Sequence, residues 1–170
     1  MAVLIIKRGP YANETAPECL NNYVLDPYKM PNLIYGAQGT SLLDPTYPIH
    51  TVKNVFCHNY GKQMDHFILS FNETEAKQLN KKLILDLAYA ICEFFPSRQI
   101  LFATHETNDS YESDEYNTSH LHIHFILNTT NVCTGYKERI NLGNVYPLRH
   151  YIGALLFHYN ISDSLMLSVK

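Results

Sequence analysis

Several features that would assign this chain to a common class are missing from its sequence. No run of apolar residues is long enough to span a bilayer. The apolar stretch at residues 2–6 is short and has no charged residues before it, so we expect a first strand there and not a signal peptide. The four cysteines lie far apart and lack Cys-x-x-Cys spacing, which argues against a zinc knuckle or a disulfide framework. We therefore expect a protein of a reducing cytoplasm.

A strong positive charge is also missing. The formal net charge is −3, whereas nucleic-acid-binding proteins usually carry a basic surface. The charge is unevenly distributed, because five acidic residues lie between Glu106 and Glu115 and no Lys or Arg occurs between Arg98 and Lys137. The rest of the chain is mildly basic, so its charge permits a phosphate-backbone partner without indicating one.

The chain is long and apolar enough for one domain with a proper core, since 46% of its 170 residues are hydrophobic. We predict strands at 3–7, 64–71, 99–105, 120–128 and 165–169, helices at 14–25, 51–60, 72–94 and 145–159, and a loop at 31–48. Strands and helices in this order predict the α+β class, with an antiparallel sheet whose helices cover one face.

The stretch from His120 to Asn128 alternates strictly between polar and apolar residues. Side chains of a strand have period two, so the apolar residues belong to a core and the polar ones to the other face. Besides Asn128, this second face would carry His120, His122 and His124. Three histidines are costly to bury unpaired, and their neutral nitrogens are good metal ligands or general bases. The strand is therefore predicted to carry chemistry.

Neighbouring strands are predicted to bring further residues to the same face. His105 ends the strand at 99–105, and His66 and Ser70 share one parity of the strand at 64–71. We expect them to meet His122 and His124 on the open face of the sheet. Imidazoles that converge from one side leave coordination positions for water or substrate, as a catalytic metal requires.

At these residues the sequence resembles the HUH endonucleases, in particular the relaxase/mobilisation nuclease family of mobile bacterial DNA. The matching motifs lie at 20–29, 66–71, 103–106 and 122–128, with Thr134-Gly135 downstream. The resemblance covers most of the chain. It implies a single nuclease domain over residues 1–170, with a ferredoxin- or RRM-like topology and the active site on the open face.

By this resemblance, Tyr23 matches the nucleophilic tyrosine, and His105, His122 and His124 match the ligands of a divalent metal ion (Mg, Mn or Zn). The family cleaves single-stranded DNA at a transfer origin, through a 5′-phosphotyrosyl link that leaves a free 3′-hydroxyl. The implied partners are that DNA and accessory mobilisation proteins, in the bacterial cytoplasm. The implied role is conjugative transfer of a plasmid or an integrative element.

Further residues have candidate roles at this site. Candidate DNA contacts are Ser70, His66, Lys29 and Asn128. Candidates to orient a ligand imidazole through a hydrogen bond are Glu106, Asp65 and His120. Competitors of Tyr23 for the role of nucleophile are Tyr11, Tyr28 and Tyr35.

Two alternatives remain open from the sequence. The stretch 120–126 also resembles the histidine-triad nucleotide hydrolases and transferases, in which His122 would attack a nucleotide α-phosphate without a metal. That family does not account for the His66 motif or for the surroundings of Tyr23. The other alternative is a non-catalytic DNA-binding accessory protein of the same fold. Metal bound to the protein would argue against the nucleotide hydrolase. A covalent adduct with DNA would argue against the non-catalytic protein.

Overall fold

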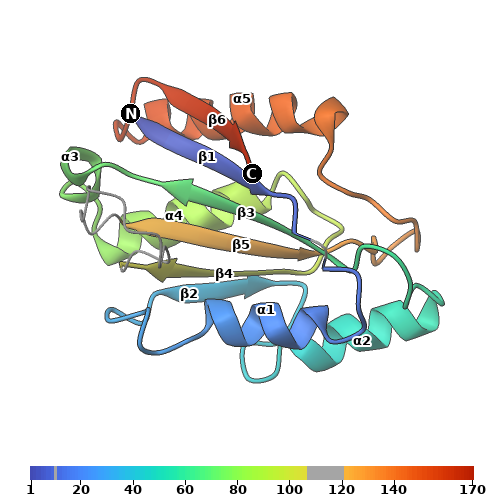
Figure 1. Cartoon of the computed structure of the whole chain (residues 1–170). Coiled ribbons are helices and arrows are strands. Elements are labelled where there is room, and N and C mark those ends of the chain that lie inside the picture. The colour runs from blue at the N-terminus through green and yellow to red at the C-terminus, as the bar shows by residue number, and fades with distance from the viewer. Residues whose placement is uncertain (10, 107–120) are drawn as a thin grey trace.

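The computed structural model describes residues 1–9, 11–106 and 121–170. Within them a six-stranded sheet has the strand order β2-β4-β5-β3-β1-β6 (Figure 1). The strands are β1 (Ala2–Lys7), β2 (Tyr35–Gln38), β3 (Met64–Ser70), β4 (Ile100–His105), β5 (His122–Asn128) and β6 (Leu165–Val169). Neighbouring strands are antiparallel except β1 and β6, which are parallel. The predicted α+β class with a mostly antiparallel sheet is confirmed.

Five helices are present in the described residues. They are α1 (Ala16–Val24), α2 (Thr46–Val55), α3 (Glu73–Ala76), α4 (Lys81–Cys92) and α5 (Leu142–His158). None of the helices in this part of the chain combines the length and apolarity needed to cross a lipid bilayer.

The two faces of the sheet pack against different helices. On one face, alternate residues of β5 such as Ile123 and Phe125 join a core with apolar residues of α4 and α5. The Phe125 ring stacks on Phe67 of β3, with the ring centroids 4.7 Å apart. On the other face, Ile126 packs with Leu20 of α1. The predicted alternation along β5 is therefore confirmed, and it separates the aromatic core from the histidine-bearing face.

The cover of the histidine-bearing face differs from the prediction. We expected helices on one face only, whereas α1 and α2 also pack over part of the other face, where Val24 and Ile49 are buried. Asn21 Nδ2 donates a hydrogen bond to Thr46 Oγ1 at 2.7 Å, which joins α1 to α2. Part of the histidine-bearing face is consequently covered by helices, and His105, His122 and His124 are buried there.

Three predicted boundaries also differ. The helix predicted at 72–94 is two helices, because Asn72 caps α3 in a capping box with Glu75 and Asn80 caps α4 anew. The α2 helix starts before residue 51, since Asp44 Oδ1 accepts hydrogen bonds from the backbone N–H groups at 46 and 47. The predicted loop at 31–48 contains β2, which pairs with β4. Its Gly36 permits this pairing, because a Cβ there would lie 2.3 Å from the Phe102 ring.

Candidate metal centre

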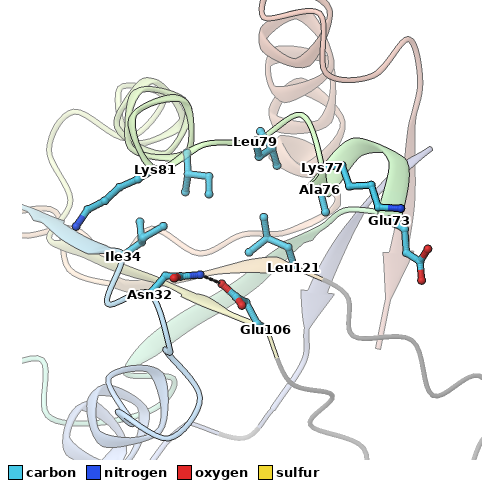
Figure 2. Close-up of a pocket in the computed structure, with 10 residues that line it drawn as sticks. Asn32, Ile34, Glu73, Ala76, Lys77, Leu79, Lys81, Glu106 and Leu121 are labelled. Carbon is cyan, nitrogen blue, oxygen red and sulfur yellow. Dashed lines mark hydrogen bonds between the residues drawn. The ribbon is translucent and has the colours of Figure 1, made fainter.

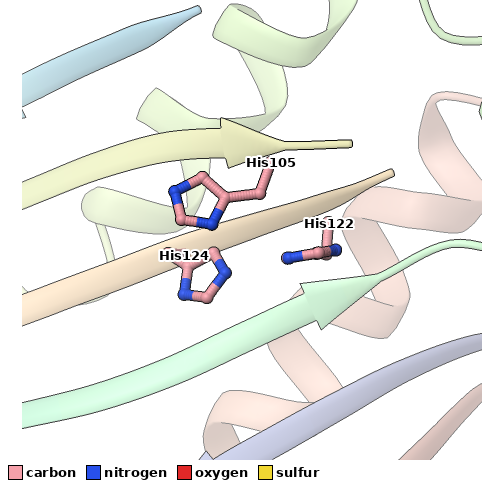
Figure 3. Close-up of side chains that lie close together, drawn as sticks. All are labelled: His105, His122 and His124. Carbon is pink, nitrogen blue, oxygen red and sulfur yellow. The ribbon is translucent and has the colours of Figure 1, made fainter. Parts of the chain in front are cut away.

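Three histidines converge where β4 ends and β5 begins. His105 pairs directly opposite His122 in the antiparallel register, and His124 lies two residues further along the same face. One ring nitrogen from each of the three residues lies within 4.8 Å of the others. All three side chains are buried, and Figure 3 shows their rings gathered over the two strands. The predicted convergence of these histidines is confirmed by the fold.

A backbone contact orients the ring of His105. Its Nε2 lies 2.9 Å from the carbonyl oxygen of Val24 at the end of α1. A carbonyl oxygen can only accept a hydrogen bond, so Nε2 carries the proton and Nδ1 carries the lone pair that a metal requires. The α1 helix therefore sets the tautomer of one candidate ligand.

A second contact orients the ring of His124. His66 Nε2 lies 2.9 Å from His124 Nδ1, and Tyr11 Oη lies 3.2 Å from His66 Nδ1. Burial raises the pKa of the Tyr11 phenol, so this hydroxyl stays protonated at neutral pH. His124 can present Nε2 to a metal when its Nδ1–H donates to His66, whose own Nδ1–H then donates to Tyr11. The chain Tyr11–His66–His124 thus supports a ligand in the way that outer hydrogen bonds support metal-binding histidines.

The histidine set fits a divalent metal ion. Buried imidazole nitrogens that converge from two strands are the donors that Zn²⁺ and similar ions take in proteins. Three protein ligands leave at least one position for water or substrate. The arrangement can therefore hold an ion with an open coordination position.

Tyr23 borders this cluster. Its ring centroid lies 5.6 Å from that of His124 and 5.7 Å from that of His105, with both pairs edge-to-face. Lys29 Nζ lies 4.0 Å from the centroid of the same ring, in a cation–π contact. The Tyr23 side chain is half-buried on the face that carries the histidines. The structure thus brings the predicted nucleophile and the predicted metal ligands together.

The competing tyrosines are placed differently. The Tyr28 side chain is 93% exposed, and Tyr35 lies half-exposed on the edge strand β2. Tyr11 does reach the cluster, but its hydroxyl contacts His66 and its pKa is raised by burial, which makes it a poor nucleophile. Its role as the partner of His66 was not predicted, because no short-range pattern relates residue 11 to residue 66.

The predicted DNA contacts have different surroundings. Ser70 is half-buried and pairs opposite His122, at the edge of the cluster. Asn128 is fully buried, donates to Gln99 Oε1 at 2.8 Å and accepts from the Thr130 N–H at 3.0 Å. Its amide thus joins the residue before β4 to the turn after β5, and both of its polar groups already have partners within the protein.

The acids predicted to orient a ligand lie elsewhere. The Glu106 carboxylate accepts a hydrogen bond from Asn32. Both residues line a cavity of about 740 Å³, which is also lined by Ile34 and by residues of α3 and α4 (Figure 2). Asp65 points to the other face of β3 and pairs with Arg98 at 2.8 Å. His120, the remaining candidate, lies outside the described residues. His66, which was predicted as a DNA contact, is the side chain that contacts the candidate ligand imidazole of His124.

Comparison with known proteins supports the same assignment. The sequence model of one family, described as the MobA/VirD2-like relaxase nuclease domain, matches residues 32–160. The match includes the three histidines of the cluster and His66, whereas Tyr23 precedes it. No curated protein and no solved structure gave a significant match to the chain.

The family match decides between the two enzyme classes that the histidine strand resembles. A histidine-triad nucleotide hydrolase with His122 as nucleophile is the wrong interpretation, because the match spans most of the chain and belongs to a different family. The relaxase nucleases are enzymes that nick single-stranded DNA by transesterification, and a buried cluster of metal-ligating residues agrees with that chemistry. The chain therefore belongs to the MobA/VirD2-like relaxase nuclease-domain family.

Proposed function

We propose that this protein is a metal-dependent nickase and transesterase that cleaves single-stranded DNA at a transfer origin, with Tyr23 as the nucleophile. One observation carries the proposal. The Tyr23 ring lies within 6 Å of the rings of His105 and His124, on the same face of the sheet. A nucleophile beside three candidate metal ligands is the arrangement that attack on a phosphodiester requires.

The proposed step exchanges one phosphate ester for another. Tyr23 Oη forms a bond to phosphorus, and the bond from phosphorus to the 3′ oxygen breaks. The phenol loses its proton and the leaving 3′ oxygen gains one, so the products are a 5′-phosphotyrosyl link and a free 3′-hydroxyl. Lys29, whose amine lies over the Tyr23 ring, places positive charge where negative charge develops. Because one phosphate ester replaces another, the reverse reaction can rejoin the strand.

His105, His122 and His124 would hold the ion in this proposal. When bound, the ion withdraws charge from the scissile phosphate and orients it. The donor set is entirely imidazole, which suits Zn²⁺ and related transition metals better than Mg²⁺, since Mg²⁺ prefers oxygen ligands. Of the metals considered, we therefore propose Zn²⁺ over Mg²⁺.

The proposed nuclease unit extends beyond the matched residues 32–160. Tyr23 and Lys29 lie before the match, and β1 pairs with both β3 and β6, which follows it. Ser70 lies at the edge of the cluster and is a proposed DNA contact together with Lys29. On this proposal the complete site requires α1 as well as the matched region.

The test uses purified protein, pooled single-stranded oligonucleotides and Mn²⁺ or Zn²⁺. We expect an adduct that survives denaturant, with mass spectrometry locating the link on Tyr23. Tyr23→Phe should abolish the adduct, whereas the matched control Tyr28→Phe should retain it because the Tyr28 side chain is almost fully exposed. His122→Ala should lower metal content as well as adduct yield.

Two results would contradict the proposal. An adduct that persists in Tyr23→Phe would assign the nucleophile to another residue. A wild-type protein that binds the oligonucleotides and the metal, yet forms no adduct with any of them, would favour the non-catalytic DNA-binding alternative.

A further inference from the structure

A group of basic and aromatic side chains lies at the opposite end of β3 and β5 from the His105–His122 pair. It is formed by the loop before β3 and the segment after β5, and we call it the basic–aromatic patch. Its members are His58, Tyr60, Lys62, Lys137 and Arg139. Tyr60 is 66% exposed, so a large aromatic ring is presented to solvent there.

The Tyr60 ring is held in place by its neighbours. Lys137 Nζ lies 4.4 Å from the ring centroid and donates a hydrogen bond to the Tyr60 carbonyl oxygen. The His58 ring meets the Tyr60 ring edge-on, with centroids 6.0 Å apart. An exposed ring with restricted motion is suited to stacking, because little conformational entropy is lost when a base packs on it.

Two cations converge on the glycine next to this ring. A Cβ placed on Gly61 would lie 3.4 Å from Arg139 Nη2 and 3.8 Å from Lys137 Nζ. The positive charge of this group also acts on the buried amine of Lys53. Burial is the main cause that lowers the pKa of this amine to about 7, and the charges of Lys137 and Arg98 lower it further. Burial and the charge of Arg139 likewise lower the pKa of Lys137.

Few acids offset this positive charge. Asp65 is buried and already pairs with Arg98 at 2.8 Å and Lys62 at 2.9 Å. The Glu138 side chain accepts a hydrogen bond from Asn131 Nδ2 at 2.7 Å. No carboxylate of the described residues forms an ion pair with Lys137 or Arg139 in the structure. Crowded like charges beside an exposed aromatic ring are the features of a site for a polyanion that also has flat rings.

The patch is connected to the metal centre along one strand. His66 of β3 contacts the centre, and Gln63, three residues earlier, donates its N–H to the Tyr11 carbonyl at 2.6 Å. The chain covers roughly 17 Å from Gln63 to Ile68, at about 3.3 Å per residue, and Ile68 pairs with His124. With the spacing that one strand has in duplex DNA, ~3.4 Å per nucleotide, that distance corresponds to about five nucleotides.

We propose that the basic–aromatic patch binds single-stranded DNA about five nucleotides from the scissile phosphate. A base stacks on Tyr60, and the adjoining phosphates contact Lys137 and Arg139. The location relative to the cut rests on the proposed nuclease function, whereas DNA binding by the patch does not. The patch would therefore anchor the strand that the metal centre cleaves.

The test measures binding of a fluorescein-labelled oligo-dT of 20 nucleotides to full-length protein by anisotropy, at several salt concentrations and without metal. Tyr60→Ala should weaken binding about five-fold or more, and Tyr60→Trp should restore it. The double variant Lys137→Ala/Arg139→Ala should reduce the slope of log K against log salt by about 1.4, at ~0.7 per lost phosphate contact. Tyr146→Ala and Lys82→Ala, exposed positions on α5 and α4, are the matched controls and should bind like wild type.

Each result separates the inference from the proposed function. The inference is wrong if Tyr60→Ala and Lys137→Ala/Arg139→Ala, confirmed as folded by circular dichroism, bind with wild-type affinity and salt slope. This holds even where wild type forms the Tyr23 adduct. If the patch variants lose binding but wild type forms no adduct, DNA binding by the patch stands, whereas the nuclease proposal and the location relative to the cut fail. Equal affinity of the patch for a 20-base-pair duplex would overturn the assignment to single strands.

Discussion

The Nε2 atom of His66 lies 2.9 Å from the Nδ1 atom of His124, so one histidine orients another at the centre of the sheet. Removing this contact by His66→Phe should weaken Zn²⁺ binding about 10- to 100-fold, because the ligand imidazole loses the group that sets its tautomer. Tyr11→Phe should cause a smaller loss, since it removes only the outer hydroxyl. Chelator competition measures both, with exposed His158→Phe as the control. Unchanged affinity in His66→Phe would exclude a supporting role.

Lys29 supplies a positive charge over the ring of Tyr23, at 4.0 Å from its centroid. Lys29→Met should slow adduct formation by about ten-fold or more, because the cation–π contact and the nearby charge are both lost. Lys29→Arg should keep most of the rate. Single-turnover cleavage with saturating metal is the measurement, and equal rates for the Met and Arg variants would show that the charge is not used.

The buried pair of Asp65 and Arg98 supports the sheet from the face opposite the histidines. Both side chains are buried, with Arg98 Nη2 2.8 Å from Asp65 Oδ2. Asp65→Asn should lower the free energy of unfolding by about 3–5 kcal/mol, because it leaves the buried guanidinium uncompensated. Lys62→Met removes the more exposed partner of the same carboxylate and should cost only about 0–1 kcal/mol. Urea unfolding compares the two, and equal losses would contradict this account.

We expect the free energy of unfolding to depend on pH because of Lys53. Its pKa falls from 10.5 to about 7 on folding, chiefly through burial. Between pH 7 and pH 10.5 the unfolded chain therefore binds more protons, so the contribution of Lys53 to the free energy of unfolding rises with pH across this window. Below pH 7 the amine is charged in both the folded and the unfolded state. Burying this charge then lowers the free energy of unfolding by the full amount, about 3–5 kcal/mol.

Lys53→Met removes this penalty while the Gln63 carbonyl that accepts from Lys53 keeps its hydrogen bond from Thr129. The variant should exceed wild type in the free energy of unfolding at pH 6, and the difference should shrink at pH 9.5. Urea unfolding at the two pH values is the measurement. A difference that does not change with pH would show that Lys53 is not a buried charge.

Two glycines should respond to alanine in opposite directions. Gly135 has φ of +70°, and a Cβ there would lie 2.3 Å from the Phe56 ring, so Gly135→Ala should destabilise the protein by about 2–4 kcal/mol. Gly153 lies within α5, where a Cβ would meet nothing within 4 Å, so Gly153→Ala should stabilise by about 0.5–1 kcal/mol. Thermal unfolding of the two variants checks both signs.

Local patterns in the sequence were sufficient for much of the framework. Strict alternation from residue 121 to Asn128 predicted a strand with one apolar and one histidine-bearing face, because side-chain period is a property of a single strand. Asn72 predicted the start of a helix, because a cap acts within three residues. The sequence did not predict that the helix is divided at Asn80, because the apolar spacing continues across this residue. It did not predict β2, because a glycine such as Gly36 usually indicates a loop.

The amino-acid sequence by itself determined which side chains share a face and where most elements lie, since these follow from contacts between near neighbours in the chain. Only the tertiary structure decided that Tyr11 supports His66, that the Val24 carbonyl orients His105, and that Arg98 neutralises Asp65. These partners are separated by 33 to 81 positions in the chain. They meet only when six strands assemble in one order, and no short-range pattern specifies which distant residue arrives beside which.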